Sequence, residues 1–142
     1  MSTAPINVRL DPRRLEQLKA IGAAMGLSNA GTISAMIREK IAAGVIPATI
    51  PGTLVTRVSD GVLISVDGNE KLFSRSGALA LASTIRGVVG GTEAPTLINL
   101  DYGFNVNKKG TGLRIAISGN DASAFPHDLA LDLADLIEKV AE

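Results

Sequence analysis

The chain has 142 residues, of which 46% are hydrophobic, and it has no cysteine and a formal net charge of zero. Such a composition supports a packed core, and the lack of cysteine excludes disulfides, thiolate catalysis and sulfur-ligated zinc. No uncharged apolar stretch approaches the ~18 residues of a membrane span, and no charged start precedes an apolar run. We therefore expect a cytoplasmic protein without a signal peptide or membrane contact.

The charge is unevenly distributed along the chain. Residues 1–50 contain six basic and three acidic side chains, a balance of +3, whereas residues 51–142 contain eight basic and eleven acidic ones, a balance of −3. A basic half followed by an acidic half is typical of a nucleic-acid-binding part joined to a part with another role. In a dimer the two basic halves together would carry a balance of +6.

Residues 6–10 alternate apolar and polar side chains, the pattern of a strand with one buried face. The apolar residues at 6, 8 and 10 share one face, and Asn7 and Arg9 share the other. So short a strand needs a partner, and helical patterns rather than a second strand follow it. We predict that it pairs with the same strand of a second chain, in an antiparallel ribbon that fits the DNA major groove.

Two helices are predicted after this strand. Asp11 and Pro12 are typical of a helix N-cap and first helical position, and Gly26 is typical of a helix end. Ser28 is the predicted N-cap of the second helix, and Gly44 ends it. Apolar side chains recur at helical spacing in both helices: Leu15, Leu18, Ile21 and Met25 in the first, and Ile33, Met36, Ile37 and Ile41 in the second.

This order of strand, helix, turn and helix resembles the ribbon-helix-helix DNA-binding proteins, the class of the Arc, MetJ and CopG repressors. The resemblance covers about residues 4–44. It rests on the segment INVRLDPRRLEQL, on GLS before the second helix, and on the apolar register that reaches MIREKI. Gly31 departs from the pattern, because a better helix former is usual in the first turn of the second helix.

The resemblance implies an intertwined homodimer that inserts its ribbon into the major groove of double-stranded DNA. Pro5, Asn7 and Arg9 would then face base edges, since Arg suits guanine and Asn suits adenine. The start of the second helix and nearby bases would contact backbone phosphates; these residues are Arg13, Arg14, Lys19, Ser28 and Asn29. The alternative is that Asn7 and Arg9 are ordinary solvent-facing residues of a sheet edge.

A domain boundary is predicted where proline and glycine interrupt the helical pattern. Residues 47–52 are the expected linker between a DNA-binding domain at 1–46 and a second domain at 53–142. The second domain is interpreted as an internal repeat, because GVLISVDGN at 61–69 matches GLRIAISGN at 112–120.

Each repeat is predicted to be three strands and a helix. Ser74 and Pro126 mark the two helix starts, and the repeat entries at 53–55 and 96–98 are matched to each other. The expected fold is α+β: a β-α-α unit, then an antiparallel sheet of about six strands with two helices on one face.

Turn signals and apolar parity place the strands of the second domain. Asp60-Gly61 and Asp67-Gly68 predict two-residue hairpins. Apolar residues of one parity predict a single long strand over 98–106, which turns at 107–110 into the next strand.

Little in the second domain indicates chemistry. The only histidine, His127, lies near Asp121, Ser123 and Asp128, which are residue types of a nucleophile and its base. The same residues suit the start of a helix, so we predict no catalytic site, and also no metal site and no cofactor.

The expected function is sequence-specific DNA binding by a dimeric transcriptional repressor that occludes its site. The second domain would join dimers on adjacent sites or bind a protein partner or small ligand. One alternative places the same module in plasmid partition or conjugation, or in an antitoxin that regulates its own operon. Another makes the second domain a ligand sensor or a small enzyme, although no residue cluster supports an enzyme.

Overall fold

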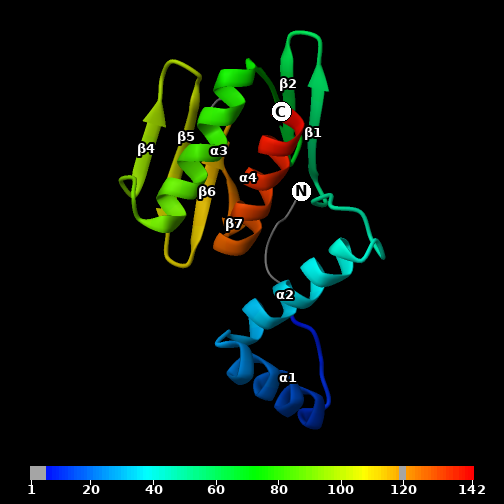
Figure 1. The fold of residues 1–142 in the computed structure, drawn as a ribbon. Coiled ribbons are helices and arrows are strands. Elements are labelled where there is room, and N and C mark those ends of the chain that lie inside the picture. The colour runs from blue at the N-terminus through cyan, green and yellow to red at the C-terminus, as the bar shows by residue number, and fades with distance from the viewer. Residues whose placement is uncertain (1–5, 119–120) are drawn as a thin grey trace. The chain divides into compact units, whose positions relative to one another are not determined.

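The computed structural model describes residues 6–118 and 121–142, which form an α+β structure (Figure 1). Within these ranges there are four helices and two antiparallel sheets. The chain divides into two units, one ending at Ala48 and the other running from Thr49 to Glu142. No single helix in the described ranges is long and apolar enough to cross a membrane; the first two helices, bent by 82° at their junction, pass that test of length and composition only when they are taken together.

Both helices predicted in the first unit are confirmed. Helix α1 (Pro12–Met25) starts with Pro12 after the N-cap Asp11, whose side chain accepts the Arg13 backbone N–H, and it ends at Gly26 in the left-handed conformation. Helix α2 (Asn29–Ala42) starts after Ser28, whose hydroxyl accepts the N–H of Gly31 at 3.1 Å. Short polar side chains at each N-cap satisfy backbone donors that the helix itself cannot.

The strand expected at residues 6–10 is not formed in the single chain, so the first unit begins with two helices rather than with a β-α-α arrangement. Ile6 and Val8 are 88% and 81% exposed, and no strand of the described residues pairs with this segment. A strand exists only where another strand accepts its backbone hydrogen bonds, and this unit offers none within one chain.

The two helices of the first unit approach each other at Gly22. Gly22 and Thr32 are the buried residues of α1 and α2 in the described structure. A methyl group on Gly22 would lie 2.7 Å from the Leu27 carbonyl oxygen and 2.8 Å from the Thr32 hydroxyl. That hydroxyl donates to the Ser28 carbonyl at 2.8 Å, which fixes its position. The missing side chain at residue 22 therefore permits this close helix contact.

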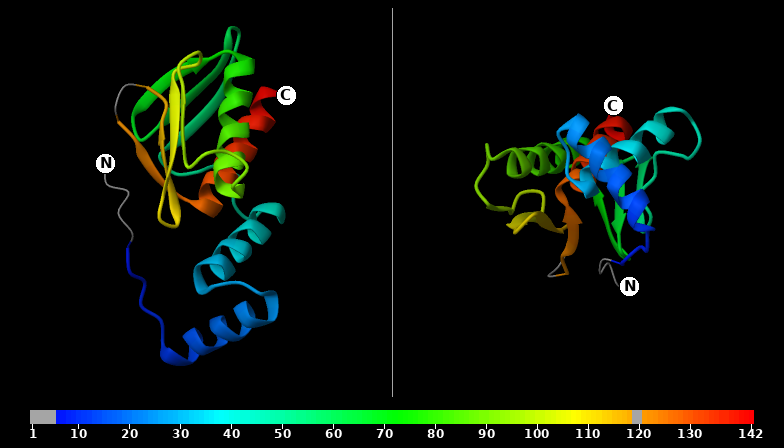
Figure 2. Two further views of the ribbon diagram at one scale, coloured as in Figure 1. Left: turned by 90° about the vertical axis from the view of Figure 1, so that its left-hand side faces the viewer. Right: turned by 90° about the horizontal axis from the view of Figure 1, so that it is seen from below.

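The second unit contains seven strands and two helices within its described residues. In chain order these are β1 (Thr53–Val58), β2 (Gly61–Val66), β3 (Asn69–Phe73), α3 (Arg75–Gly90), β4 (Thr96–Asn99), β5 (Phe104–Lys109), β6 (Gly112–Ala116), β7 (Ser123–Pro126) and α4 (His127–Ala141). The two helices lie next to each other on one side of the strands (Figures 1 and 2). The helix starts predicted at Ser74 and Pro126 are confirmed, because these residues are the N-caps of α3 and α4.

The strands form two sheets, ordered β1-β2-β3 and β4-β5-β6-β7, and not one sheet of six strands as expected. Side chains, rather than a backbone ladder, join the sheets. The Lys71 ammonium on β3 donates to the carbonyls of Tyr102 and Gly103 at 2.6 and 2.8 Å, and the rings of Phe73 and Phe104 pack with centroids 6.4 Å apart.

The predicted match of 61–69 to 112–120 aligns β2 with β6, but the entry strand of the second repeat differs from the predicted one. The first repeat is three strands and a helix, and β5, β6, β7 and α4 follow the same order in the second. The strand that forms a hairpin with β6 is β5, just as β1 forms a hairpin with β2. The match of 53–55 to 96–98 is therefore wrong, and β4 is an additional edge strand.

The long strand predicted over 98–106 is also wrong, because the chain reverses between β4 and β5 and Ile98 pairs with Asn105. The Asn99 side chain accepts the Tyr102 N–H at 2.9 Å, and Gly103 adopts a φ of 74°. A short amide side chain followed by a glycine with positive φ builds a tight turn, which outweighs apolar parity here.

One of the three predicted hairpin turns lies where it was predicted, and the other two are displaced. Asp67 and Gly68 both have positive φ, as a type I′ turn requires, so that hairpin is confirmed. The first hairpin is displaced by one residue, because Val58 pairs with Gly61 and the turn is formed by Ser59 and Asp60. The β5–β6 turn is likewise displaced from 107–110, since Lys109 pairs with Gly112.

Both repeats contribute to a single hydrophobic core. The largest fully buried side chains of the second unit come from strands and helices of each repeat: Val62, Ile64, Leu81, Ile85, Val88, Val106, Leu113, Leu133 and Ile137. Ile50 belongs to this core at 8% exposure, so part of the expected linker at 47–52 is packed against the second unit. Across the helices, Arg86 of α3 donates to Glu138 at 3.0 and 2.6 Å and also to Asp135.

Candidate nucleic-acid interface

The predicted base-reading side chains that the structure describes are accessible. Asn7 and Arg9 lie in the exposed segment before α1, and neither has a hydrogen-bond partner among the described residues. Pro5, the third predicted base contact, lies outside the described residues. Both described side chains therefore keep their full donor capacity for another molecule.

Arg13, predicted to contact phosphate, is engaged within its own helix start. Its guanidinium donates to both carboxylate oxygens of Asp11, at 2.9 and 2.7 Å. The Arg13 side chain lowers the pKa of Asp11 by this hydrogen bond, and Asp11 raises the pKa of Arg13 in return. Since both side chains are exposed to solvent, the ion pair is weak, but the carboxylate offsets the charge that a phosphate would meet.

The other predicted phosphate contacts occupy two places on the first unit. Arg14 donates to the Gln17 side chain at 2.9 Å and lines, with Asp11 and Arg13, a shallow hollow of about 300 Å³ at the start of α1. Lys19 is exposed on α1 outside that hollow. Arg13 and Arg14 are thus brought together, whereas Lys19 is not part of their group.

Ser28 and Asn29 form the N-terminus of α2, where the first backbone N–H groups of any helix lack intrahelical acceptors. Gly31 lies beside this cap, and a methyl group on it would be 3.2 Å from the Ser28 hydroxyl. The glycine that departs from the family pattern therefore leaves room for the capping bond. Such a helix start can bind an anion that is placed next to its free N–H groups.

The first unit leaves its apolar side chains uncovered. Between residues 6 and 42, nine large hydrophobic side chains are 40–88% exposed: Ile6, Val8, Leu10, Ile21, Met25, Leu27, Ile33, Met36 and Ile37. They include most of the apolar side chains that recur at helical spacing in the two predicted helices. Exposed apolar side chains in this number favour an interaction site, because a unit of this size otherwise buries little of a core.

Comparison of the chain with protein-family models, curated proteins and solved structures gave no match.

Two of the residues considered for catalysis lie on β7 and at the start of α4. Ser123 is buried on β7 and His127 is the first residue of α4, and no hydrogen bond between them is present in the described structure. The described residues also contain no group of three or more His, Cys, Asp or Glu side chains able to hold a metal ion.

Sequence reasoning missed the contact of Gly22 with Thr32. A glycine in mid-helix and a β-branched residue ten positions later give no periodic signal. The available hint was the glycine itself. Glycine inside a helix costs up to ~1 kcal/mol relative to alanine, so its presence there usually has a packing reason.

Proposed function

We propose that this chain is a dimeric, sequence-specific DNA-binding protein of the ribbon-helix-helix type, acting most simply as a transcriptional repressor. The observation that carries the proposal is the uncovered apolar face of the first unit. A second copy of the same unit would cover that face and would supply the strand that residues 6–10 lack. The pairing turns a segment without a partner into an antiparallel ribbon.

The uncovered side chains are sufficient in number to drive this association. Complete burial of one large apolar side chain stabilises by about 1.5–3 kcal/mol, and these residues are roughly half exposed, so each would contribute about half of that. Nine such side chains on each of two chains exceed the ~4–15 kcal/mol entropic cost of association. Dimerisation and folding of the first unit are therefore expected to be one process.

In this dimer the ribbon presents Asn7 and Arg9 of both chains to the major groove. Arg9 would donate two hydrogen bonds to guanine and Asn7 would pair with adenine, while the start of α2 receives a backbone phosphate. Accessible, unpartnered side chains at both positions support these roles. Binding would block access of other proteins to the same DNA site.

The second unit has its own core, which favours a repressor or an accessory protein over an antitoxin. Antitoxins of this type usually carry a short tail that folds on the toxin. Plasmid partition and conjugation remain as settings in which the same DNA-binding mode would serve. A partition ATPase or relaxase encoded beside this gene would favour those settings over transcriptional repression.

The test is selection of bound duplexes from random DNA, followed by affinity measurements with Arg9→Ala. Two copies would each lose a contact of roughly 1–3 kcal/mol, so affinity for selected DNA should fall at least ~30-fold with an unchanged melting temperature. Arg114→Ala, which removes an exposed arginine from β6, is the matched control and should bind normally. Retention of full affinity by Arg9→Ala would contradict the assignment.

Salt dependence supplies a second readout in the same experiment. The slope of log affinity against log salt should be about −0.9 for each phosphate neutralised. The Arg9→Ala protein should keep most of this slope, because a base-reading residue contributes specificity rather than phosphate contacts.

A further inference from the structure

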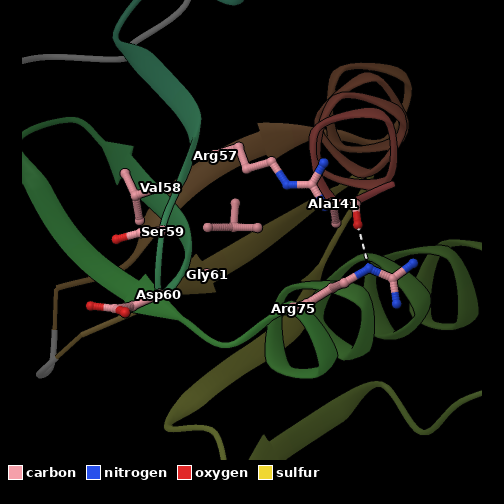
Figure 3. A pocket seen from close by; sticks show the side chains of 8 residues that line it. Arg57, Val58, Ser59, Asp60, Gly61, Arg75 and Ala141 are labelled. Carbon is pink, nitrogen blue, oxygen red and sulfur yellow. Dashed lines mark hydrogen bonds between the residues drawn. The ribbon is translucent and has the colours of Figure 1, made fainter.

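A hollow of about 270 Å³ lies in the second unit where the β1–β2 hairpin meets the start of α3 and the end of α4 (Figure 3). It is lined by Arg57, Val58, Ser59, Asp60, Gly61, Val62, Arg75 and Ala141. Its volume is just below the ~300–1,000 Å³ of pockets for drug-sized ligands, so it suits a smaller molecule. Neither the DNA-binding proposal nor the core of the second unit uses these polar groups.

Two arginines from different elements line this hollow. Arg57 lies on the same face of β1 as Val55, which packs against the core. Near the end of β1, however, Arg57 lines the hollow together with Ala141, the last residue of α4. Arg75 is the first residue of α3, and its Nε donates to the Ala141 carbonyl at 2.6 Å. Figure 3 shows the two side chains on either side of Ala141.

Most of the donor capacity of these arginines is unused in the described structure. The Arg57 guanidinium has no hydrogen-bond or ion-pair partner there, and Arg75 uses only its Nε. Arg75 also lies at a helix N-terminus, where the helix dipole disfavours a positive charge. Asp60, the acidic residue of the lining, points away from both guanidinium groups (Figure 3). An anion between the arginines would use these free donors.

We infer that this hollow binds the phosphate or carboxylate group of a small anionic ligand. Arginine is the residue best suited to such groups, because its planar fork donates two parallel hydrogen bonds to an oxyanion. The partner is a small molecule rather than a flat surface, since the site is concave and is bordered by a hairpin on one side and two helix ends on the other.

The test is an NMR titration of the full chain with inorganic phosphate and, separately, with malonate, in the absence of DNA. Saturable shifts are expected at the backbone amides of Ser59, Asp60 and Gly61 and at the Arg75 Nε. The two probes distinguish a tetrahedral from a planar oxyanion by which of them binds more tightly. Arg57→Gln should weaken binding about tenfold or more, because it removes a charged hydrogen-bond donor.

Asp60→Asn should change the affinity for the anion in the opposite direction to Arg57→Gln. Asparagine matches aspartate in size and is common in turns, so the turn at Ser59 and Asp60 is kept while a negative charge is removed. Binding should become about two- to fivefold tighter, by weaker repulsion of the ligand across solvent. Arg114→Gln, on another sheet, should leave binding unchanged and controls for net charge.

Two results would overturn the inference. One is the absence of saturable shifts at the hairpin amides with both probes, or shifts of the same strength in the Arg57→Gln protein. The other is that Arg57→Gln weakens binding of duplex DNA but not of either probe, which would make the hollow a DNA contact. Because the titration contains no DNA, its failure leaves the proposed DNA-binding function standing.

Discussion

Substitution of Gly22 by alanine tests whether the close contact of α1 and α2 supports the first unit. The added methyl would lie 2.7 Å from the Leu27 carbonyl oxygen and 2.8 Å from the Thr32 hydroxyl, closer than such atoms can approach. Neither neighbour can move freely, because one is backbone and the other is held by a hydrogen bond to Ser28. The helices must therefore separate.

The expected magnitude follows from two opposing terms. Overpacking costs about 1–3 kcal/mol, whereas alanine in place of glycine in a helix gains up to ~1 kcal/mol. Since the contacts at residue 22 are unusually rigid, we expect a net loss of about 1–2 kcal/mol per chain, doubled in a dimer. In the proposed dimer, affinity for DNA should fall with stability, because the two helices would position the ribbon.

The assay is denaturant unfolding followed by circular dichroism, with Gly90→Ala as the matched control. Gly90 lies at the end of α3 with no atom within 4 Å of an added methyl, so its replacement should be neutral or slightly stabilising. The cost of Gly22→Ala should also shrink in a Thr32→Ala background, in which one of the two clashes is absent. A Gly22→Ala protein as stable as the unmodified chain would refute the packing argument.

Three further predictions concern charge and core packing. Arg13→Gln should reduce DNA affinity much less than Arg9→Ala does, because Asp11 already holds the Arg13 guanidinium; an equal loss by fluorescence anisotropy would contradict this. Arg86 lowers the pKa of Glu138, so their ion pair stabilises the fold above the ordinary pKa near 4.5 and is lost as pH falls through the lowered value. Arg86→Gln should therefore cost at most ~1 kcal/mol at pH 7, because both side chains are about 40% exposed, and less once the pH falls below the lowered pKa of Glu138; urea unfolding across this pH range checks the difference. Ile64→Ala empties a fully buried site and should cost about 2–5 kcal/mol in thermal unfolding, and a loss below 1 kcal/mol would be inconsistent with that burial.

Helix boundaries were predictable from the sequence because they depend on local chemistry. Asp11, Ser28 and Ser74 are N-caps in the structure, and each is a short polar residue that bonds a backbone N–H within the next three residues. Such an interaction needs nothing from the rest of the fold. The Asp67-Gly68 hairpin was predictable for the same reason, since both residues tolerate positive φ.

Sheet organisation was harder to predict because it depends on contacts between distant segments. Apolar parity suggested one strand through Leu100, but Leu100 is 88% exposed at the reversal between β4 and β5. The division into two sheets depends on Lys71 and on the packing of Phe73 against Phe104, which no local pattern encodes. Register and pairing partners are properties of the whole fold.

The candidate interface was predictable as residue types but not as geometry. Asn7 and Arg9 are accessible, whereas the pairing of Arg13 with Asp11 was not anticipated. The arginine hollow was missed because Arg57 and Arg75 are eighteen positions apart and come together only through the ends of three elements. Long-range convergence of this kind leaves no spacing signal in the sequence.

The most direct test of the proposed ribbon is disulfide cross-linking of Val8→Cys in this cysteine-free chain. When residues 6–10 pair antiparallel with their own copy, position 8 is central and faces itself at about 4.5–5.5 Å between Cα atoms, within the ~4.4–6.8 Å range of disulfides. Mild oxidation should then give a covalent dimer of twice 14.6 kDa on a non-reducing gel, while Val58→Cys on β1 should stay monomeric. If Val8→Cys cross-links no more than Val58→Cys does, the two front segments do not pair and the proposed groove-reading surface does not exist.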